Sequence, residues 1–191
     1  MKAKGFTIVE LIVIIVVIGV LAGIVALVWP NYLKQTHDAE RRSDLQQLAS
    51  ALDVYALQKN NLLTTGSNCG KNGQGNGWVS AAGTVGTDTY PNSIISCLQA
   101  IEALPGEPFT DPSGCVSVGA GDCTVPVRAY MKATCTKSSQ TVTYVFGHLE
   151  TEPRIDTEVD ALCDAGSVLG FDATTQKWGS LYGMNYYVKV N

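Results

Sequence analysis

The feature that most constrains this chain is a long apolar segment close to its N-terminus. Residues 6–29 contain 20 apolar residues, and the four exceptions are Thr7, Glu10, Gly19 and Gly23. A helix of this length would extend about 36 Å, which is enough to cross the hydrocarbon core of a bilayer. The segment therefore excludes a fully soluble protein and predicts one membrane-spanning helix.

The residues on either side of the apolar segment predict how it sits in a membrane. Lys2 and Lys4 are the only charges before it, and they place the N-terminus in the cytoplasm and the rest of the chain across the membrane. Trp29 and Tyr32 follow it and are typical of a membrane–water interface. A secretory signal peptide is disfavoured, because no Ala-x-Ala cleavage site ends the segment.

Glu10 is the one ionisable residue inside the apolar segment. A charged side chain at the centre of a membrane helix costs about 2.5–3.5 kcal/mol on insertion scales, so its presence indicates a functional partner. One candidate is the new N-terminal ammonium of Phe6, if the chain is cut after Gly5, and the other is a second chain. The alternative is that Glu10 lies near the cytoplasmic interface and reaches water there.

The sequence Lys-Gly followed by Phe6-Thr7-Ile8-Val9-Glu10-Leu11 resembles the class III signal of type IV pilins and of type II secretion pseudopilins. The resemblance implies that a prepilin peptidase cuts after Gly5 and N-methylates Phe6. It also implies that Glu10 acts in assembly, by pairing with the N-terminal amine of a neighbouring subunit. Many family members carry a proline where this chain has Leu27, and here the proline is Pro30. The kink of the membrane helix is therefore expected to shift or to be absent.

The remaining pattern predicts an α+β fold, with a long N-terminal helix packed on a small antiparallel sheet, which is the pilin fold of the resembling family. An apolar stripe at helical spacing follows Pro30 and predicts one helix from about Phe6 to about Gln58. Residues 60–92 are rich in glycine and predict a loop, in which Trp78 and Tyr90 anchor the chain to the head. The stripe consists of Leu45, Leu48, Ala49, Leu52, Tyr55 and Ala56.

Further along the chain, residues 93–104 predict a short helix that ends before Pro105. Period-two alternation predicts strands at 127–133, 141–146 and 185–190, with a turn at 137–140 between the first two. The expected organisation is a leader peptide at 1–5, a membrane and filament-core helix at 6–29, an amphipathic stem helix at 30–59 and a globular head at 60–191.

All six cysteines follow the apolar segment and none forms a CxxC pair, which disfavours zinc and predicts disulfides in an oxidising compartment. Six cysteines allow 15 pairings, and the pattern does not select among them. The short glycine-rich loop between Cys115 and Cys123 makes that pair the first expectation, and Cys135–Cys163 is the second. The candidates are Cys69, Cys97, Cys115, Cys123, Cys135 and Cys163.

The sequence does not support an enzyme. His37 and His148 are its only histidines, so a Ser-His-Asp set is not credible. Cys-His catalysis is disfavoured because the cysteines are expected to be paired. No cofactor is expected. From residue 60 onward seven basic and twelve acidic residues give a net charge of −5, which disfavours nucleic-acid binding.

Two charged clusters have open interpretations. An acidic cluster could hold Ca²⁺, as some related pseudopilins do, although a solvated loop is favoured. Arg41 and Arg42 are expected on a solvated helix face, with anionic lipid or a neighbouring subunit as the alternative. The acidic cluster consists of Glu150, Glu152, Asp156, Glu158, Asp160 and Asp164.

The resemblance implies a structural subunit of a type IV pilus-like extracellular filament. Its partners would be copies of itself, other pilins, the prepilin peptidase and an inner-membrane assembly platform. It would be a single-pass protein of the cytoplasmic membrane before assembly and part of an extracellular pilus afterwards. The alternatives are a pseudopilin of a type II secretion system, or a minor pilin whose head mediates adhesion or DNA uptake. Tyr90-Pro91 and Leu104-Pro105 partly match the head of the pseudopilin G-like subgroup.

Overall fold

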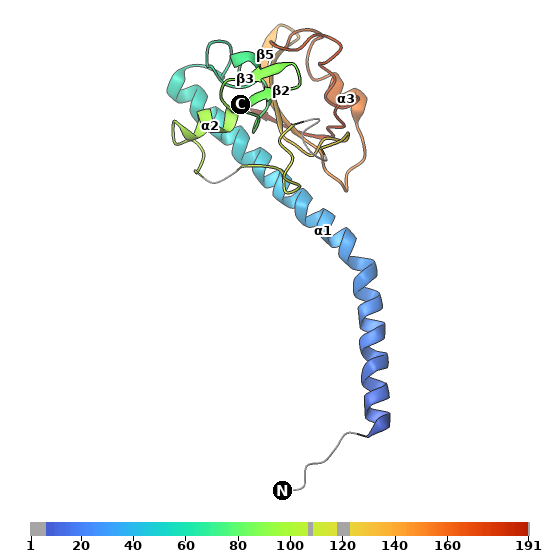
Figure 1. Ribbon diagram of the computed structural model, residues 1–191. Helices are drawn as coiled ribbons and strands as arrows, with labels where there is room; N and C mark the ends of the chain where they lie inside the picture. The colour runs from blue at the N-terminus through green and yellow to red at the C-terminus, as the bar shows by residue number, and fades with distance from the viewer. Residues whose placement is uncertain (1–6, 107–108, 118–122, 191) are drawn as a thin grey trace. The chain divides into compact units, whose positions relative to one another are not determined.

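The computed structural model describes residues 7–106, 109–117 and 123–190 of the chain. The chain divides into two compact units, residues 1–37 and 38–191, each of which is described by itself. Helix α1 (Ile8–Lys59), drawn in blue to cyan in Figure 1, continues through Pro30 without a break and supplies residues to both units. The prediction of one long helix is therefore confirmed over its described part, and so is the α+β fold class.

The ends of α1 are defined by local backbone chemistry. Thr7 precedes the first helical residue, and its side chain accepts a hydrogen bond from the N–H of Glu10 at 3.3 Å. At the other end Asn60 has a φ of 51°, the left-handed conformation that commonly terminates helices. Every residue from 7 to 36 is exposed, so the apolar part of the helix is not buried by any described residue of its own unit.

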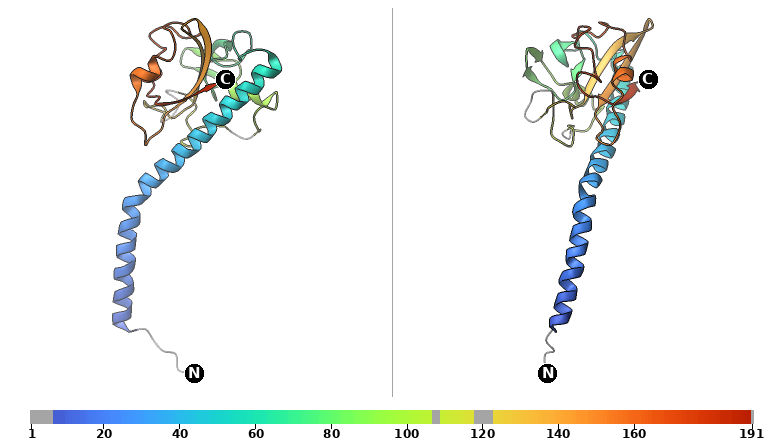
Figure 2. Two further views of the ribbon diagram at one scale, coloured as in Figure 1. Left: turned by 180° about the vertical axis from the view of Figure 1, so that it is seen from behind. Right: turned by 90° about the vertical axis from the view of Figure 1, so that its right-hand side faces the viewer.

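The second unit is built on a four-stranded antiparallel sheet in the order β1-β4-β5-β6. Figure 2 shows the ribbon from two further sides. A two-stranded antiparallel ribbon and three short helices complete it. The sheet consists of β1 (Gly77–Trp78), β4 (Met131–Lys137), β5 (Gln140–Gly147) and β6 (Tyr186–Val190). The ribbon is β2 (Gly83–Val85) with β3 (Asp88–Tyr90), and the helices are η1 (Lys71–Gly73), α2 (Ile94–Gln99) and α3 (Asp156–Asp160).

Three expectations about the secondary structure were wrong. The first long strand begins at Met131 rather than at residue 127, because the N–H of Val127 bonds to the carbonyl of Tyr182 instead of to a sheet neighbour. The region 60–92 is not a plain loop, since it contains η1, β1, β2 and β3. Helix α2 ends at Gln99, well before Pro105, because Glu102 has a φ of 60° that no α-helix accommodates.

The hairpin between β4 and β5 follows the prediction closely. Its register pairs Lys137 with Gln140, which leaves a two-residue loop. Ser138 and Ser139 both have positive φ values, of 49° and 68°, as primed hairpin turns require. The N–H of Ser138 donates to the carboxylate of Asp164 at 3.0 Å, so a distant segment stabilises a turn whose residues do not favour this conformation.

One face of the sheet packs on the second half of α1. Leu45, Leu48 and Leu52 are at most 3% exposed and lie in one apolar cluster with Val145 and Val190 of the sheet. The predicted stripe is thus confirmed as the buried face of the stem from Leu45 to Leu52, while Tyr55 and Ala56 are half-buried. Gly147 allows the close approach, because a Cβ atom there would lie 2.8 Å from a methyl group of Leu45.

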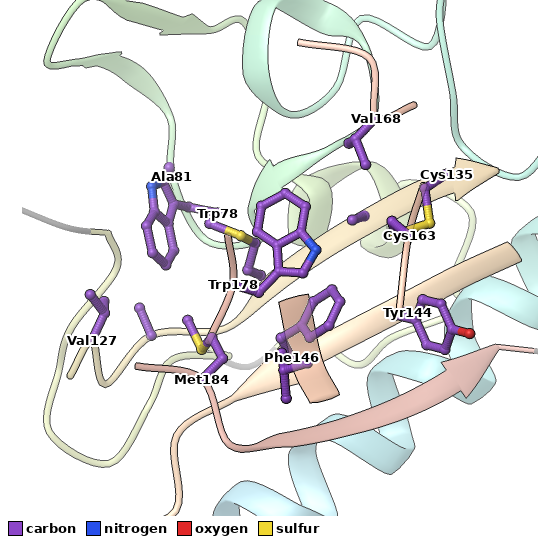
Figure 3. Packing of buried hydrophobic residues seen from close by; sticks show 14 of the residues in the cluster. Trp78, Ala81, Val127, Cys135, Tyr144, Phe146, Cys163, Val168, Trp178 and Met184 are labelled. Carbon is purple, nitrogen blue, oxygen red and sulfur yellow. A yellow bond between two sulfur atoms is a disulfide. The ribbon is translucent and has the colours of Figure 1, made fainter. Parts of the chain in front are cut away.

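The opposite face of the sheet is covered by the C-terminal loops. Trp178 is fully buried in a cluster with Phe146 and Met184, and its ring centroid lies 5.5 Å from that of Phe146 (Figure 3). Trp78 and Tyr90 are buried in the same cluster, so the expected anchoring of the glycine-rich region is confirmed. Along β4 this face takes alternate residues, which leaves Lys132 and Thr134 on the side that α1 covers.

The six cysteines form three disulfides, Cys69–Cys97, Cys115–Cys123 and Cys135–Cys163. Two of these are the pairs that the sequence favoured. Cys69–Cys97 joins the glycine-rich region to helix α2, a link for which the spacing of the cysteines gave no indication. Cys135–Cys163 lies at the edge of the Trp178 cluster and ties the C-terminal loops to β4 (Figure 3).

Candidate functional site

The first turn of α1 holds Glu10 in a reciprocal capping arrangement with Thr7. The N–H and the hydroxyl of Thr7 both donate to Oε2 of Glu10 at 2.8 Å, while the N–H of Glu10 donates to the Thr7 hydroxyl oxygen. This is a capping box, in which two otherwise unpaired backbone donors are satisfied. The other carboxylate oxygen, Oε1, has no hydrogen bond within the described residues, so it is available to a second partner.

Apart from Thr7, the described helix surface next to Glu10 is apolar and exposed. Within the described residues, α1 is the one helix long and apolar enough to cross a membrane, and none of its apolar window is buried. Ile8, Val9 and Leu11 are 78%, 70% and 57% exposed. The helix can therefore bury this surface only in lipid or against other chains.

The predicted processing residues lie outside the part of the chain that the structure describes. Cleavage after Gly5 and N-methylation of Phe6 remain predictions, as does the assembly role of Glu10. The cap itself was missed by the sequence analysis. Its signal was present, because Thr7 followed three residues later by Glu10 is the sequence signature of a capping box.

Arg41 contradicts the expectation of a solvated helix face. Its side chain is fully buried, and the guanidinium donates to Asp111 at 2.6 and 3.1 Å, to Asp38 at 3.0 Å and to Glu150 at 3.0 Å. Burial opposes the charge, but the paired carboxylates, above all Asp111, raise the pKa of Arg41 above its usual value. Arg41 thus connects α1 to two separate loops of the head.

Asp38 strengthens the same connection from the preceding turn of α1. Its carboxylate accepts the N–H groups of Glu150 and Thr151, both at 2.8 Å, and the Thr151 hydroxyl at 2.7 Å. Burial opposes its ionisation, yet these hydrogen bonds and the one from Arg41 lower the pKa of Asp38. Asp38, Arg41, Asp111 and Glu150 form what we term the stem ion cluster.

Arg42 differs from Arg41 in that it stays partly exposed, at 38% for its side chain. It pairs with Glu152 at 2.5 Å and lies over the ring of Tyr186, 5.7 Å from its centroid. Two neighbouring arginines therefore have different environments, because residues one apart on a helix point in directions about 100° apart.

The acidic cluster is dispersed in the structure, and no group of three such side chains within the described ranges could hold a metal ion. Most of its members have protein partners of their own. Glu150 pairs with Arg41 and Arg128, Glu152 with Arg42, and Asp156 with Arg154, while Asp160 accepts the N–H of Gly179 and Asp164 accepts the N–H of Ser138.

The N-terminal residues match a known family model. Residues 1–26 fit the prokaryotic N-terminal methylation motif. The resemblance to type IV pilins and pseudopilins is confirmed. The long apolar helix and this motif together fit a membrane-anchored precursor.

Curated relatives with the name type II secretion system core protein G are similar to part of the chain. Identity is 40% over 67 residues to the proteins of Pectobacterium carotovorum and Escherichia coli K12, and 37% over 67 residues to that of Aeromonas hydrophila. These matches cover 34% of this chain and 41%, 44% and 45% of the relatives, so the chain spans less than half of their length. No solved structure matches the chain significantly.

Proposed function

We propose that this chain is a structural subunit of a type IV pilus-like extracellular filament. The observation that carries the proposal is an apolar helix, exposed at every residue from 8 to 28, whose one carboxylate lies in the first turn and within the matched methylation motif. Such a helix changes its surroundings without changing its structure: lipid covers it before assembly and neighbouring helices cover it afterwards. The segment stays helical in both lipid and the filament, because a helix pairs its backbone N–H and C=O groups internally.

Export and maturation follow from the N-terminal residues. Lys2 and Lys4 keep the N-terminus in the cytoplasm, and the head lies across the membrane, where its disulfides form. A prepilin peptidase removes residues 1–5 and methylates Phe6, and an assembly platform in the inner membrane then extracts the subunit into the filament. In this scheme residues 6–29 are the filament-core segment, and the chain is not an enzyme.

Glu10 sets the stagger between subunits in this proposal. Thr7 holds Oε2, which leaves Oε1 for the N-terminal ammonium of Phe6 on a neighbouring subunit. A buried carboxylate without a cation is strongly destabilising, whereas a pair is tolerated and specifies register. Subunits would therefore add only at the position where the ammonium meets Oε1.

The test is the yield of filaments from Glu10→Ala. We expect normal membrane insertion and normal cleavage but a loss of most assembled filament, measured by shearing and immunoblotting. Glu40→Ala is the matched control, because Glu40 is an exposed carboxylate on the same helix beyond the apolar segment. A normal filament yield from Glu10→Ala would refute the proposal. Gly5→Leu should leave uncleaved precursor, and a processed product would exclude cleavage after Gly5.

The second candidate is a pseudopilin of a type II secretion system, which the names of the curated relatives favour. Both functions use the same N-terminal helix, so similarity within a third of the chain does not separate them. Deletion of the gene separates them: loss of surface filaments in electron microscopy indicates a pilin, and accumulation of secreted enzymes in the periplasm indicates a pseudopilin.

A further inference from the structure

The segment between α1 and β1 has an unusual concentration of left-handed backbone. Four residues other than glycine have positive φ values, namely Asn60 at 51°, Leu63 at 53°, Asn68 at 58° and Asn72 at 52°. Asparagine tolerates this conformation, whereas leucine disfavours it, so at Leu63 it persists only where surrounding contacts enforce it. We term residues 60–76 the strained loop.

A buried lysine provides such contacts. Lys132 of β4 is 0% exposed, and its Nζ donates to the carbonyls of Leu63 at 3.1 Å and Gly75 at 2.7 Å. Nζ also lies 3.4 Å from Oδ1 of Asn76 and 2.8 Å from the hydroxyl oxygen of Thr134. Three of these four oxygens belong to the strained loop, so a single nitrogen joins both ends of that loop to the sheet.

The loop ends are packed too closely to rearrange in small steps. Gly75 has a φ of 72°, and a Cβ atom there would lie 1.7 Å from the carbonyl oxygen of Leu63. Asn76 is fully buried, and its Oδ1 also accepts the N–H of Thr134 at 2.8 Å. The oxygens around Nζ are therefore held in place, and water does not reach Nζ unless the loop moves.

No anion balances the charge of Lys132 within the described part of the chain. All four of its printed neighbours are neutral oxygens, and burial lowers the pKa of Lys132 to about 7. Titratable side chains do occur on the surrounding elements, but none of them bonds to Nζ. They are Asp53 and Lys59 of α1, Lys71 of η1, Tyr90 of β3, Tyr144 of β5, Lys189 of β6, and Asp164 and Asp172 of the C-terminal loops.

We propose that Lys132 is a proton-dependent latch, which holds the strained loop against β4 as an amine and loosens it when a proton binds. The amine donates two N–H groups to the loop carbonyls and turns its lone pair toward the Thr134 hydroxyl, whereas an ammonium is a cation without an anion in a buried site. Because water reaches Nζ only when the loop opens, protonation favours the loosened loop. The loop surface around Asn72, which is exposed, would then respond to the pH outside the cell.

The experiment is a titration of the full-length chain in detergent micelles, labelled with ¹³C at glycine Cα and lysine Cε. These C–H signals do not exchange with water, so they remain visible at alkaline pH. We expect the Cε signal of Lys132 and the Cα signal of Gly75 to shift together, with one midpoint at least about two pH units below the ordinary lysine value. The Lys132 signal is identified by its absence from Lys132→Arg.

Lys71→Met is the matched control, because Lys71 lies in the same loop but pairs with Asp88 at 2.9 Å. We expect this variant to keep both shifts, and Lys132→Met to abolish that of Gly75. A Lys132 signal that titrates near pH 10, or a Gly75 signal that does not follow it, overturns the proposal. The comparison of the two signals in the unmodified chain decides the question even if Lys132→Met does not fold.

Discussion

The stem ion cluster should contribute strongly to the stability of the second unit, and Arg41→Met is the direct test. The substitution keeps most of the volume of the side chain but removes the cation from Asp38, Asp111 and Glu150. Because Asp38 and Asp111 are 1% and 2% exposed, water does not replace it. Removal of one partner from a buried ion pair costs about 3–5 kcal/mol.

The structure places Arg41→Met near the lower end of that range. Asp38 keeps its bonds from Glu150 N–H, Thr151 N–H and the Thr151 hydroxyl, and Asp111 keeps its bonds from Ser113. We therefore expect a loss of about 3 kcal/mol in the free energy of unfolding. For a unit of this size that corresponds to a fall of about 6–12 °C in Tm.

The assay is thermal unfolding of the full chain in detergent, followed by near-ultraviolet circular dichroism. Arg42→Met is the control, since Arg42 and Glu152 are 38% and 45% exposed, and such pairs contribute less than about 1 kcal/mol. The double variant Arg41→Met with Asp111→Asn should lose less than the sum of the single losses. Equal Tm values for Arg41→Met and Arg42→Met would show that the cluster does not stabilise the head.

The remaining predictions concern the helix cap, a disulfide and the response to acid. Thr7→Val should weaken the first turn of α1 by about 1 kcal/mol and lower filament yield less than Glu10→Ala does, as shearing assays will show. Replacement of Cys69 and Cys97 by serine opens a loop with a sequence separation of 28 and should cost about 3–4 kcal/mol in thermal unfolding, and an unchanged Tm would contradict this. The folded-state pKa of Asp38 is lowered, so its contribution is present above about pH 4 and lost as the pH falls below it. Tm measured from pH 6 to pH 2.5 should therefore fall, and it should fall less in Asp38→Asn.

The sequence predicted those parts of the fold that depend on local periodicity. The helical stripe around Leu45 and Leu48, the turn between β4 and β5, and the last strand all occur as expected. Each pattern is set by residues close together in the chain, and each buries the face that its period defines. The Cys115–Cys123 pair belongs to the same class, because a separation of 8 keeps the two cysteines near each other.

The errors occurred where a residue's environment depends on distant segments. Arg41 and Arg42 are adjacent residues of the same type. Arg41 differs in that it is buried and bonds to Asp111, which lies 70 residues further along the chain. Lys132 is a similar case, since alternation placed it on one face of a strand but did not reveal that Leu63 and Gly75 would surround it. Buried charges are rare enough that periodicity assigns them to the surface by default.

Asp38 and Glu10, two carboxylates of α1, differ in whether the described chain supplies a cation for them. This difference separates a site that acts in folding from one that acts in assembly. Asp38 finds its cation, Arg41, three residues away on the same helix, so residues 38–191 contain everything that the stem ion cluster needs. Glu10 receives only the neutral donors of Thr7 within the described chain, and it lies on a surface that is fully exposed. A change at Arg41 should therefore lower Tm in an isolated subunit, whereas a change at Glu10 should leave that Tm unaltered and appear only when subunits meet. If Glu10→Ala lowered the Tm of the head, the separation would be wrong, because the two sites would then share one cooperative unit.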